Sequence, residues 1–261
     1  MDDVLDALEA QQLELLNLVR GADDAELGAA TRCEGWSVAD VLLHLAQSNE
    51  MAVASVEGRM EDAIRGLGST MGAGDGAELP TGGVVTDVDD WAGEAVAAER
   101  GLPVAAIRDR WWRSAQDQLA AFRSVDLDTR VRWVAGMMAA RSLATTRLSE
   151  CWIHTVDVAS ARGERPAPTD RLWHICRLVW RTVPYAFERA GRELHGPVAF
   201  ALHAPDGSTW QFGDEEAPTV ISGPAEDLCE VAGQRADAAA SGLTAVGPDA
   251  TAALVVIRTF A

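Results

Sequence analysis

Apolar residues recur at helical intervals through most of the first 190 residues. Spacings of three and four residues predict helices, because they place side chains on one face of an α-helix. The predicted helices cover residues 4–19, 38–65, 103–122, 137–161 and 172–190. The second of these begins at a capping box, in which Ser37 precedes Asp40 by three residues. Pro184 is expected to kink or interrupt the last helix, because proline has no backbone N–H to donate.

The connections and the C-terminal part follow other patterns. Residues 66–90 are rich in glycine and acids and predict a long loop, and Trp133 and Gly136 lie in a predicted connector. From residue 191 onward the period changes to two, which predicts a hairpin of strands 198–202 and 209–212, a third strand at 219–222 and short helices at 224–231 and 248–257. The sequence therefore predicts a mainly α protein with a helical unit over 1–190 and a small α+β unit over 191–261.

The charge balance excludes some partners and some chemistry. The chain has 261 residues, with 40 Asp and Glu against 22 basic residues, and its formal net charge is −18. Proteins that bind nucleic acids or anionic membrane surfaces usually carry the opposite balance, so we expect neither partner. All the basic residues are arginine, which excludes a Schiff-base lysine and a P-loop lysine.

The location of the protein is predicted from what the sequence lacks. No apolar run is long enough to span a bilayer, and the first ten residues are acidic where a signal peptide would be basic. The four cysteines are far apart and form no CxxC pair, so we expect reduced and mostly buried thiols. These features predict a soluble cytoplasmic protein.

Three potential metal ligands are expected to meet inside the helical bundle. Glu150 and His154 stand four residues apart and so share one helix face, and His44 lies in the middle of the second helix. If the two helices are neighbours, these side chains form a two-histidine, one-carboxylate set that leaves coordination positions open. The alternative is a buried structural histidine and a solvent-facing polar pair. The apolar neighbours Leu148 and Trp152 argue against the solvent-facing pair.

Four charged residues near these ligands have two interpretations each. Asp40 lies one turn before His44 and is either a hydrogen-bond partner of that imidazole or only a helix cap. Asp157, three residues after His154, has the same two roles open to it. Arg141 and Arg147 are expected either to bind a carboxylate substrate or to form surface ion pairs.

Two segments resemble a known group of proteins. The stretch GWSVADVLLHL and the later ARSLATTRLSECWIHTVDVA resemble the DinB-like superfamily, in the branch typified by mycothiol-dependent maleylpyruvate isomerase. The matching positions are Trp36, Asp40 and His44, followed by Glu150 and His154. The stretches WWRSAQDQLAAFRSVDLDTRVRW, GMMAARS and GPAEDLCEVAGQR resemble an actinobacterial subgroup described as metal-binding proteins. The resemblance implies a four-helix bundle followed by a small sterol-carrier-like α+β domain.

The resemblance also implies ligands and an activity. It implies a divalent metal held by His44, Glu150 and His154, with Zn²⁺ as the first choice and Ni²⁺ or Fe²⁺ as alternatives, and mycothiol as the thiol cofactor. Trp36 and Arg235 would belong to the substrate pocket; the subgroup reads Gln-Arg-Arg-His where this chain has Gln-Arg-Ala-Asp at 234–237. A metal-bound thiol is deprotonated and would add to an electrophilic carbon, giving isomerisation or S-transfer.

Two other functions remain open from the sequence. One is a thiol-independent, metal-dependent lyase, isomerase or hydrolase of a specialised pathway. The other is a non-catalytic, metal-stabilised protein that binds a small molecule. In each case the expected partner is a small molecule, and the chain is expected to be a monomer or a homodimer.

Overall fold

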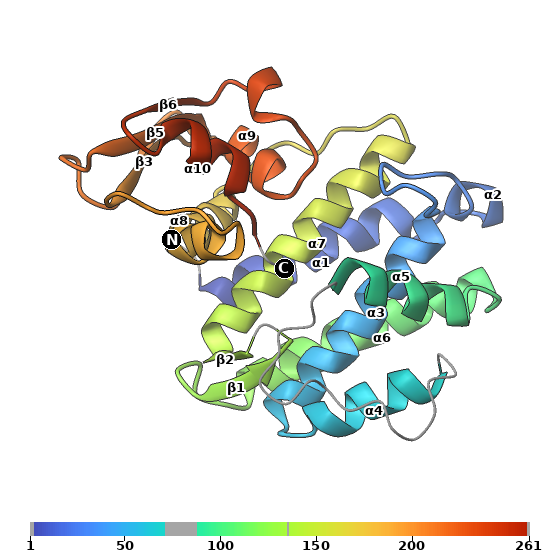
Figure 1. Cartoon of the computed structure of the whole chain (residues 1–261). Coiled ribbons are helices and arrows are strands. Elements are labelled where there is room, and N and C mark those ends of the chain that lie inside the picture. The colour runs from blue at the N-terminus through green and yellow to red at the C-terminus, as the bar shows by residue number, and fades with distance from the viewer. Residues whose placement is uncertain (1–2, 71–87, 135, 260–261) are drawn as a thin grey trace.

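The computed structural model describes residues 3–70, 88–134 and 136–259, which form a mainly helical structure (Figure 1). The helices are α1 Val4–Val19, α2 Asp24–Leu27, α3 Val38–Val56, α4 Met60–Thr70, α5 Val88–Glu99, α6 Val104–Arg123, α7 Ala140–Ala161, α8 Leu172–Arg189, α9 Ala225–Ala232 and α10 Ala250–Val256. A short 3-10 helix, η1, covers Ala238–Ala240. The strands are β1 Arg130–Trp133, β2 Gly136–Ala139, β3 Val198–His203, β4 Thr209–Phe212, β5 Thr219–Pro224 and β6 Thr244–Val246.

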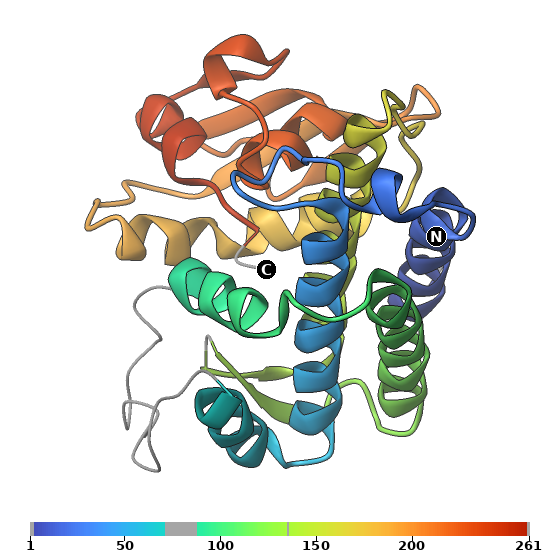
Figure 2. The same cartoon turned by 90° about the vertical axis from the view of Figure 1, so that its right-hand side faces the viewer.

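Four long helices form a bundle, as the sequence predicts. Helix α3 packs along α6 and α1 along α7, while α3 also contacts α7 and α1 contacts α6 (Figure 2). The apolar stripes of these helices meet in the interior, where Leu8, Leu42, Trp111 and Leu148 are almost completely buried. Among the described residues, no helix combines the length and the apolar character needed to cross a bilayer.

The second predicted helix is in fact two helices. Helix α3 ends at Val56, and α4 begins at Met60 after a turn in which Gly58 adopts a positive φ of 73°. Glycine reaches this backbone conformation without steric cost, so the chain can turn here although apolar residues continue beyond it. Of the loop predicted over 66–90, the first residues belong to α4 and the last to α5, and 71–87 lies outside the described residues.

The predicted connector before α7 is a β-hairpin. Strands β1 and β2 pair antiparallel, and Trp133 stands opposite Gly136. Val131 and Trp133 are buried while Arg130 and Arg132 are exposed, which is the alternation of a half-buried strand. Helix α7 consequently begins at Ala140 rather than at Met137.

The C-terminal unit contains the predicted hairpin and third strand, and one further strand. Its sheet has the order β4-β3-β5-β6, with β3 parallel to β5 and antiparallel to β4. The two predicted short helices are α9 and α10. The short edge strand β6 was not predicted, because three residues are too few to show a period.

Helix α8 connects the two units and continues through Pro184 without interruption. Pro184 lies on the exposed side of α8. The buried side of the helix contacts strands β3 and β4, and α8 lies below this sheet in Figure 2. Trp180 donates a hydrogen bond from Nε1 to the carbonyl of Val198, and its ring contacts Phe212. Because α8 contacts both α7 and the sheet, the boundary between residues 190 and 191 stays a prediction.

Candidate metal centre

His44 reaches the site from the middle of α3, whose start is fixed by the predicted capping box. The side chain of Ser37 accepts a hydrogen bond from the backbone of Asp40, and the carboxylate of Asp40 accepts from the backbone and hydroxyl of Ser37. The other carboxylate oxygen accepts from Nε of Arg100 at 2.9 Å. Asp40 therefore acts as a helix cap and an ion-pair partner, and both of its oxygens are engaged away from His44.

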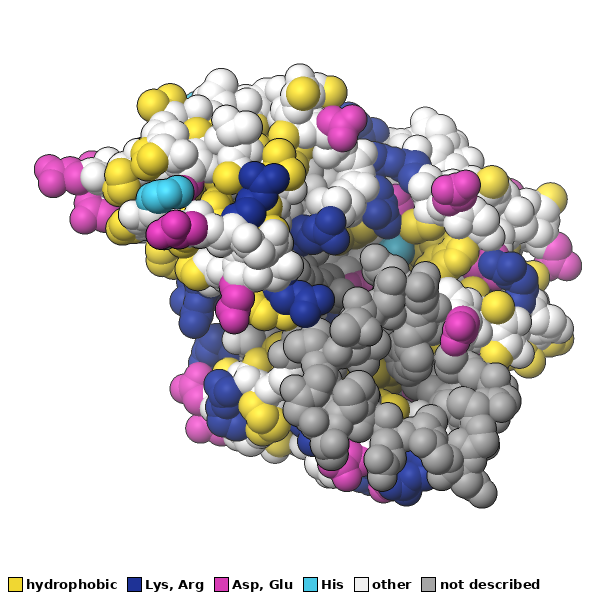
Figure 3. Space-filling model, viewed as in Figure 1, with side chains coloured by type: hydrophobic (Ala, Val, Ile, Leu, Met, Phe, Trp, Pro, Cys, Tyr) yellow, Lys and Arg dark blue, Asp and Glu magenta, His cyan; other side chains and the backbone are white. Residues whose placement is uncertain are grey.

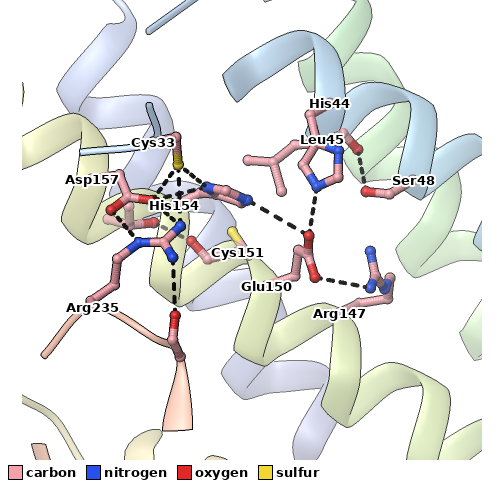
Figure 4. Close-up of polar contacts among 12 residues, drawn as sticks. Cys33, His44, Leu45, Ser48, Arg147, Glu150, Cys151, His154, Asp157 and Arg235 are labelled. Carbon is pink, nitrogen blue, oxygen red and sulfur yellow. Dashed lines mark hydrogen bonds and ion pairs between the residues drawn. The ribbon is translucent and has the colours of Figure 1, made fainter. Parts of the chain in front are cut away.

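His44, Glu150 and His154 converge, as the spacing along α7 and the bundle topology predict (Figure 4). Nε2 of His44 lies 2.6 Å from Oε1 of Glu150, and Nε2 of His154 lies 3.6 Å from the same oxygen. One ligand atom from each residue falls within 4.8 Å of the others. The three side chains are between 8% and 14% exposed, so the cluster is nearly closed to solvent.

Trp36 covers the two imidazoles. Its ring centroid is 5.1 Å from that of His44 and 6.4 Å from that of His154, and it is nearly parallel to the His154 ring. Trp36 and Cys33 belong to one tight turn, in which the backbone N–H of Trp36 donates to the carbonyl of Cys33 and Gly35 has a positive φ of 75°. This turn therefore brings two side chains to the site just before α3 begins.

Glu150 is held as an anion. Burial raises the pKa of its carboxyl, but the charge of Arg147 and hydrogen bonds from both histidines outweigh burial and lower the pKa well below its usual range. Arg147 donates to Oε2 at 3.3 Å, and its guanidinium lies 5.0 Å from the centre of the Trp133 ring. Oε1 is thus left to face the two histidines.

The two histidines differ in charge. Burial lowers the pKa of His44, and the opposing attraction of Glu150 does not restore it. Burial also disfavours the charged form of His154, but hydrogen bonds with Asp157, Cys33 and Glu150 raise its pKa well above the usual value. The lowered pKa favours neutral His44, and the raised pKa favours protonated His154.

The opposite side of His154 is a second polar group. Nδ1 of His154 donates to Oδ2 of Asp157 at 3.1 Å, and the thiol of Cys33 donates to the same oxygen at 3.2 Å. Arg235 binds Asp157 with two hydrogen bonds of 2.7 and 2.8 Å. Burial raises the pKa of Asp157, but the hydrogen bonds from His154 and Arg235 keep it ionised. Asp157 and Arg235 thus lie directly beside His154 in the structure.

Other candidates lie elsewhere or were overlooked. Arg141 is exposed at the start of α7, where it pairs with Asp128 at 3.3 Å, and it does not join the cluster. Burial raises the pKa of Cys151 to about 12, so its thiol stays protonated. Cys33 was not singled out by sequence reasoning; its position in the short stretch before the capping box was the available signal.

Arginine side chains, drawn in dark blue, lie between the C-terminal unit and the bundle on the face shown in Figure 3. Trp36 and Arg235, which lie next to the histidine cluster, are half-buried.

Comparison with known proteins identifies the family. Residues 8–159 match the family described as mycothiol maleylpyruvate isomerase N-terminal domain. Two proteins of Mycobacterium tuberculosis, described as uncharacterized, from strains CDC 1551 / Oshkosh and ATCC 25618 / H37Rv, are each 33% identical over 233 residues, which is 88% of this chain and 84% of theirs.

Solved structures support the same fold. The crystal structure of the mycothiol-dependent maleylpyruvate isomerase aligns with a TM-score of 0.58 at 18% identity, and that of its histidine-to-alanine mutant with the same score at 17%. Each alignment covers 94% of this chain and 95% of the other. The match over both units confirms the predicted bundle with a small α+β unit, and the chain belongs to the mycothiol maleylpyruvate isomerase family.

Proposed function

We propose that this protein is a metal-dependent enzyme that uses a small thiol, and that it is an isomerase or S-transferase. His44, Glu150 and His154 would hold one divalent ion, with Zn²⁺ as the first choice and Ni²⁺ or Fe²⁺ as alternatives. The observation that carries the proposal is the convergence of these three donors from two helices within 4.8 Å. Membership of a family named for a mycothiol-dependent isomerase supports the thiol and the reaction class.

The donor set fits a divalent cation with open positions. Two imidazoles and one carboxylate form a ligand set that occurs in catalytic zinc sites, where further positions remain for water or substrate. Glu150 is already an anion, and Asp157 holds the Nδ1–H of His154, so that Nε2 is the nitrogen left for the ion. Neighbouring ligand atoms in a tetrahedral zinc site stand about 3.3 Å apart. His44 and Glu150, at 2.6 Å, must therefore exchange their hydrogen bond for the ion.

The surrounding side chains would prepare the site for chemistry. A bound divalent ion would act as a Lewis acid that lowers the pKa of a small thiol. Arg147 holds Glu150 in place by its far oxygen. Trp36 covers the imidazoles and keeps water from that side. By family resemblance the thiol would be mycothiol and the substrate a small electrophile.

The metal part is tested by elemental analysis of the purified protein. We expect one divalent ion per chain, and loss of most of it in His154→Ala and in Glu150→Ala. His203→Ala is the matched control, because that histidine is exposed on β3. Full metal occupancy in both site variants would place the metal elsewhere and overturn the proposal.

The thiol part is tested with Co²⁺ in place of the native ion. Adding mycothiol should produce an intense sulfur-to-cobalt charge-transfer band, and the band should persist in Cys33→Ser, which excludes the protein's own nearby thiol. A Co²⁺ protein whose spectrum does not respond to mycothiol or to other small thiols would rule out thiol binding. Turnover without a thiol would then identify a thiol-independent metalloenzyme, and no turnover together with unfolding on chelation would identify a binding protein.

A further inference from the structure

Three donor atoms on the far side of His154 have the spacing of a second cation site. Sγ of Cys33, Nδ1 of His154 and Oδ2 of Asp157 are separated by 3.9, 3.2 and 3.1 Å. In a tetrahedral site with metal–sulfur bonds of about 2.3 Å and metal–nitrogen or metal–oxygen bonds of about 2.0–2.2 Å, ligand atoms stand about 3.3–3.6 Å apart. Each observed separation lies within a few tenths of an ångström of that range. A thiolate, an imidazole and a carboxylate together favour a thiophilic divalent ion.

A cation of the protein itself lies beside these donors. Arg235 donates from Nη2 to Sγ of Cys33 at 3.1 Å and to Oδ2 of Asp157 at 2.8 Å, and from Nε to the other carboxylate oxygen at 2.7 Å. A guanidinium that contacts two of the three donors supplies the positive charge that an ion would bring. It also fills the space beside the donors.

The backbone around Arg235 is built to place this side chain. Gln234 has a φ of 59°, and it is the only non-glycine residue with a positive φ in the described part of the chain. This conformation ends α9, with the N–H of Gln234 bonded to the carbonyl of Val231 and that of Arg235 to the carbonyl of Glu230. A non-glycine residue pays a conformational cost in this region, and the turn at Gln234 leads the chain directly to Arg235 beside Asp157.

We propose that Cys33, Asp157 and Nδ1 of His154 form a second ligand set for a thiophilic divalent cation, and that Arg235 keeps this set closed. A neutral imidazole offers one lone pair, so His154 serves a cation through Nε2 or through Nδ1 but not through both. With Arg235 in place, Nδ1 keeps its proton and donates to Asp157, and Nε2 is left for the set with His44 and Glu150. Arg235 thus selects which of two positions receives the metal.

The test is the Co²⁺ absorption spectrum of Arg235→Met and Arg235→Gln, without added thiol. We expect a sulfur-to-cobalt charge-transfer band in both variants, absent from the unmodified protein and lost when Cys33→Ser is added. Arg32→Gln is the matched control, because Arg32 donates a hydrogen bond to the backbone carbonyl of Arg235. This variant loses a neighbouring positive charge but keeps the guanidinium of Arg235. It should show no band.

The inference shares His154 with the proposed function, and a further pair of variants separates the two. His44→Ala removes a ligand of the first set only; we expect the sulfur band in His44→Ala/Arg235→Met and none in His44→Ala. If His44→Ala/Arg235→Met shows the sulfur band but the unmodified protein binds no Co²⁺, the proposed function is overturned. The second ligand set, formed by Cys33, Asp157 and His154, is then supported.

Two results would overturn the inference itself. One is the absence of a sulfur band from every folded Arg235 variant, with folding checked by circular dichroism. The other concerns alkylation of Cys33 in the unmodified protein, read from the modified peptide by mass spectrometry. Because Arg235 closes the second ligand set, excess Zn²⁺ should not protect Cys33 from the alkylating reagent, and protection would contradict the inference.

Discussion

The proposed metal site predicts how metal binding depends on pH, because the charge states of its three proposed ligands differ. The pKa values of Glu150 and His44 are both lowered. Before metal is added, the lowered values favour an ionised Glu150 carboxyl and a neutral His44 imidazole. His154 has a raised pKa and therefore carries a proton on both nitrogens at neutral pH. A metal ion that binds through Nε2 must displace this proton, so we expect one proton to be released for each ion bound.

The magnitude follows from this single proton. Below the pKa of His154, apparent metal affinity should rise about tenfold per pH unit, or about 1.4 kcal/mol, and above that pKa it should level off. Asp157→Asn removes the anionic acceptor of Nδ1, so the pKa of His154 should fall and the level region should begin at lower pH. Within that region the affinity should still be about 10–100-fold weaker, because the carboxylate that orients the imidazole is lost.

Calorimetric Zn²⁺ titrations in buffers of different ionisation enthalpy measure both quantities. Asp128→Asn is the matched control, because Asp128 is an exposed carboxylate that pairs with Arg141 outside the cluster. It should keep the proton release and the pH profile of the unmodified protein. Zinc binding without proton release near neutral pH, or an unchanged profile in Asp157→Asn, would refute the assignment of the proton to His154.

Three further predictions concern the elements that carry the site. Ser37→Ala should destabilise the protein by about 0.5–2 kcal/mol in urea unfolding, because it removes the cap of α3, whereas Ser208→Ala in an exposed turn should have little effect. Trp36→Ala should speed removal of the bound ion by a chelator, measured against the unmodified protein, because it uncovers both imidazoles; an unchanged rate would show that the ring does not shield them. The protein can also be expressed as two separate chains, cut either after residue 165 or after residue 190. The fragments 1–165 and 166–261 should associate in pull-down assays and yield more soluble protein than 1–190 and 191–261, because the first cut leaves α8 with the sheet that its apolar face contacts. The reverse result would support the boundary at 190.

The sequence was sufficient where a local rule determines the geometry. The capping box at Ser37 and Asp40 fixes the start of α3, and the four-residue spacing of Glu150 and His154 places both on one face of α7. His44 meets Glu150 and His154 because α3 and α7 are in contact in the bundle. The prediction of a helical bundle, in which the two helices could be neighbours, was enough to expect this meeting. The break near Gly58 was missed, because the apolar spacing continues across it into α4.

The contacts that assign roles to the other residues are not local. Cys33 and Asp157 are 124 residues apart, Arg235 and Asp157 are 78 apart, and His44 and Glu150 are 106 apart. Helical periodicity tells which face a residue occupies, but it does not tell which distant side chain meets that face.

Asp40 and Asp157 show how tertiary contacts decide between roles that look alike in sequence. Each lies three or four residues from a histidine, and the sequence allows each the same two roles. Arg100 and Ser37 use both oxygens of Asp40 at the start of α3, whereas Arg235 and Cys33 hold Asp157 against Nδ1 of His154. The arginine that pairs with each carboxylate comes from a distant segment. Arg100, which pairs with Asp40, directly follows α5, and Arg235, which pairs with Asp157, belongs to the C-terminal unit. A carboxylate near a histidine in sequence therefore orients the imidazole only where its tertiary contacts direct it to that ring. Arg235 of the C-terminal unit holds Asp157 beside His154, whereas Ser37 and Arg100 hold Asp40 away from His44.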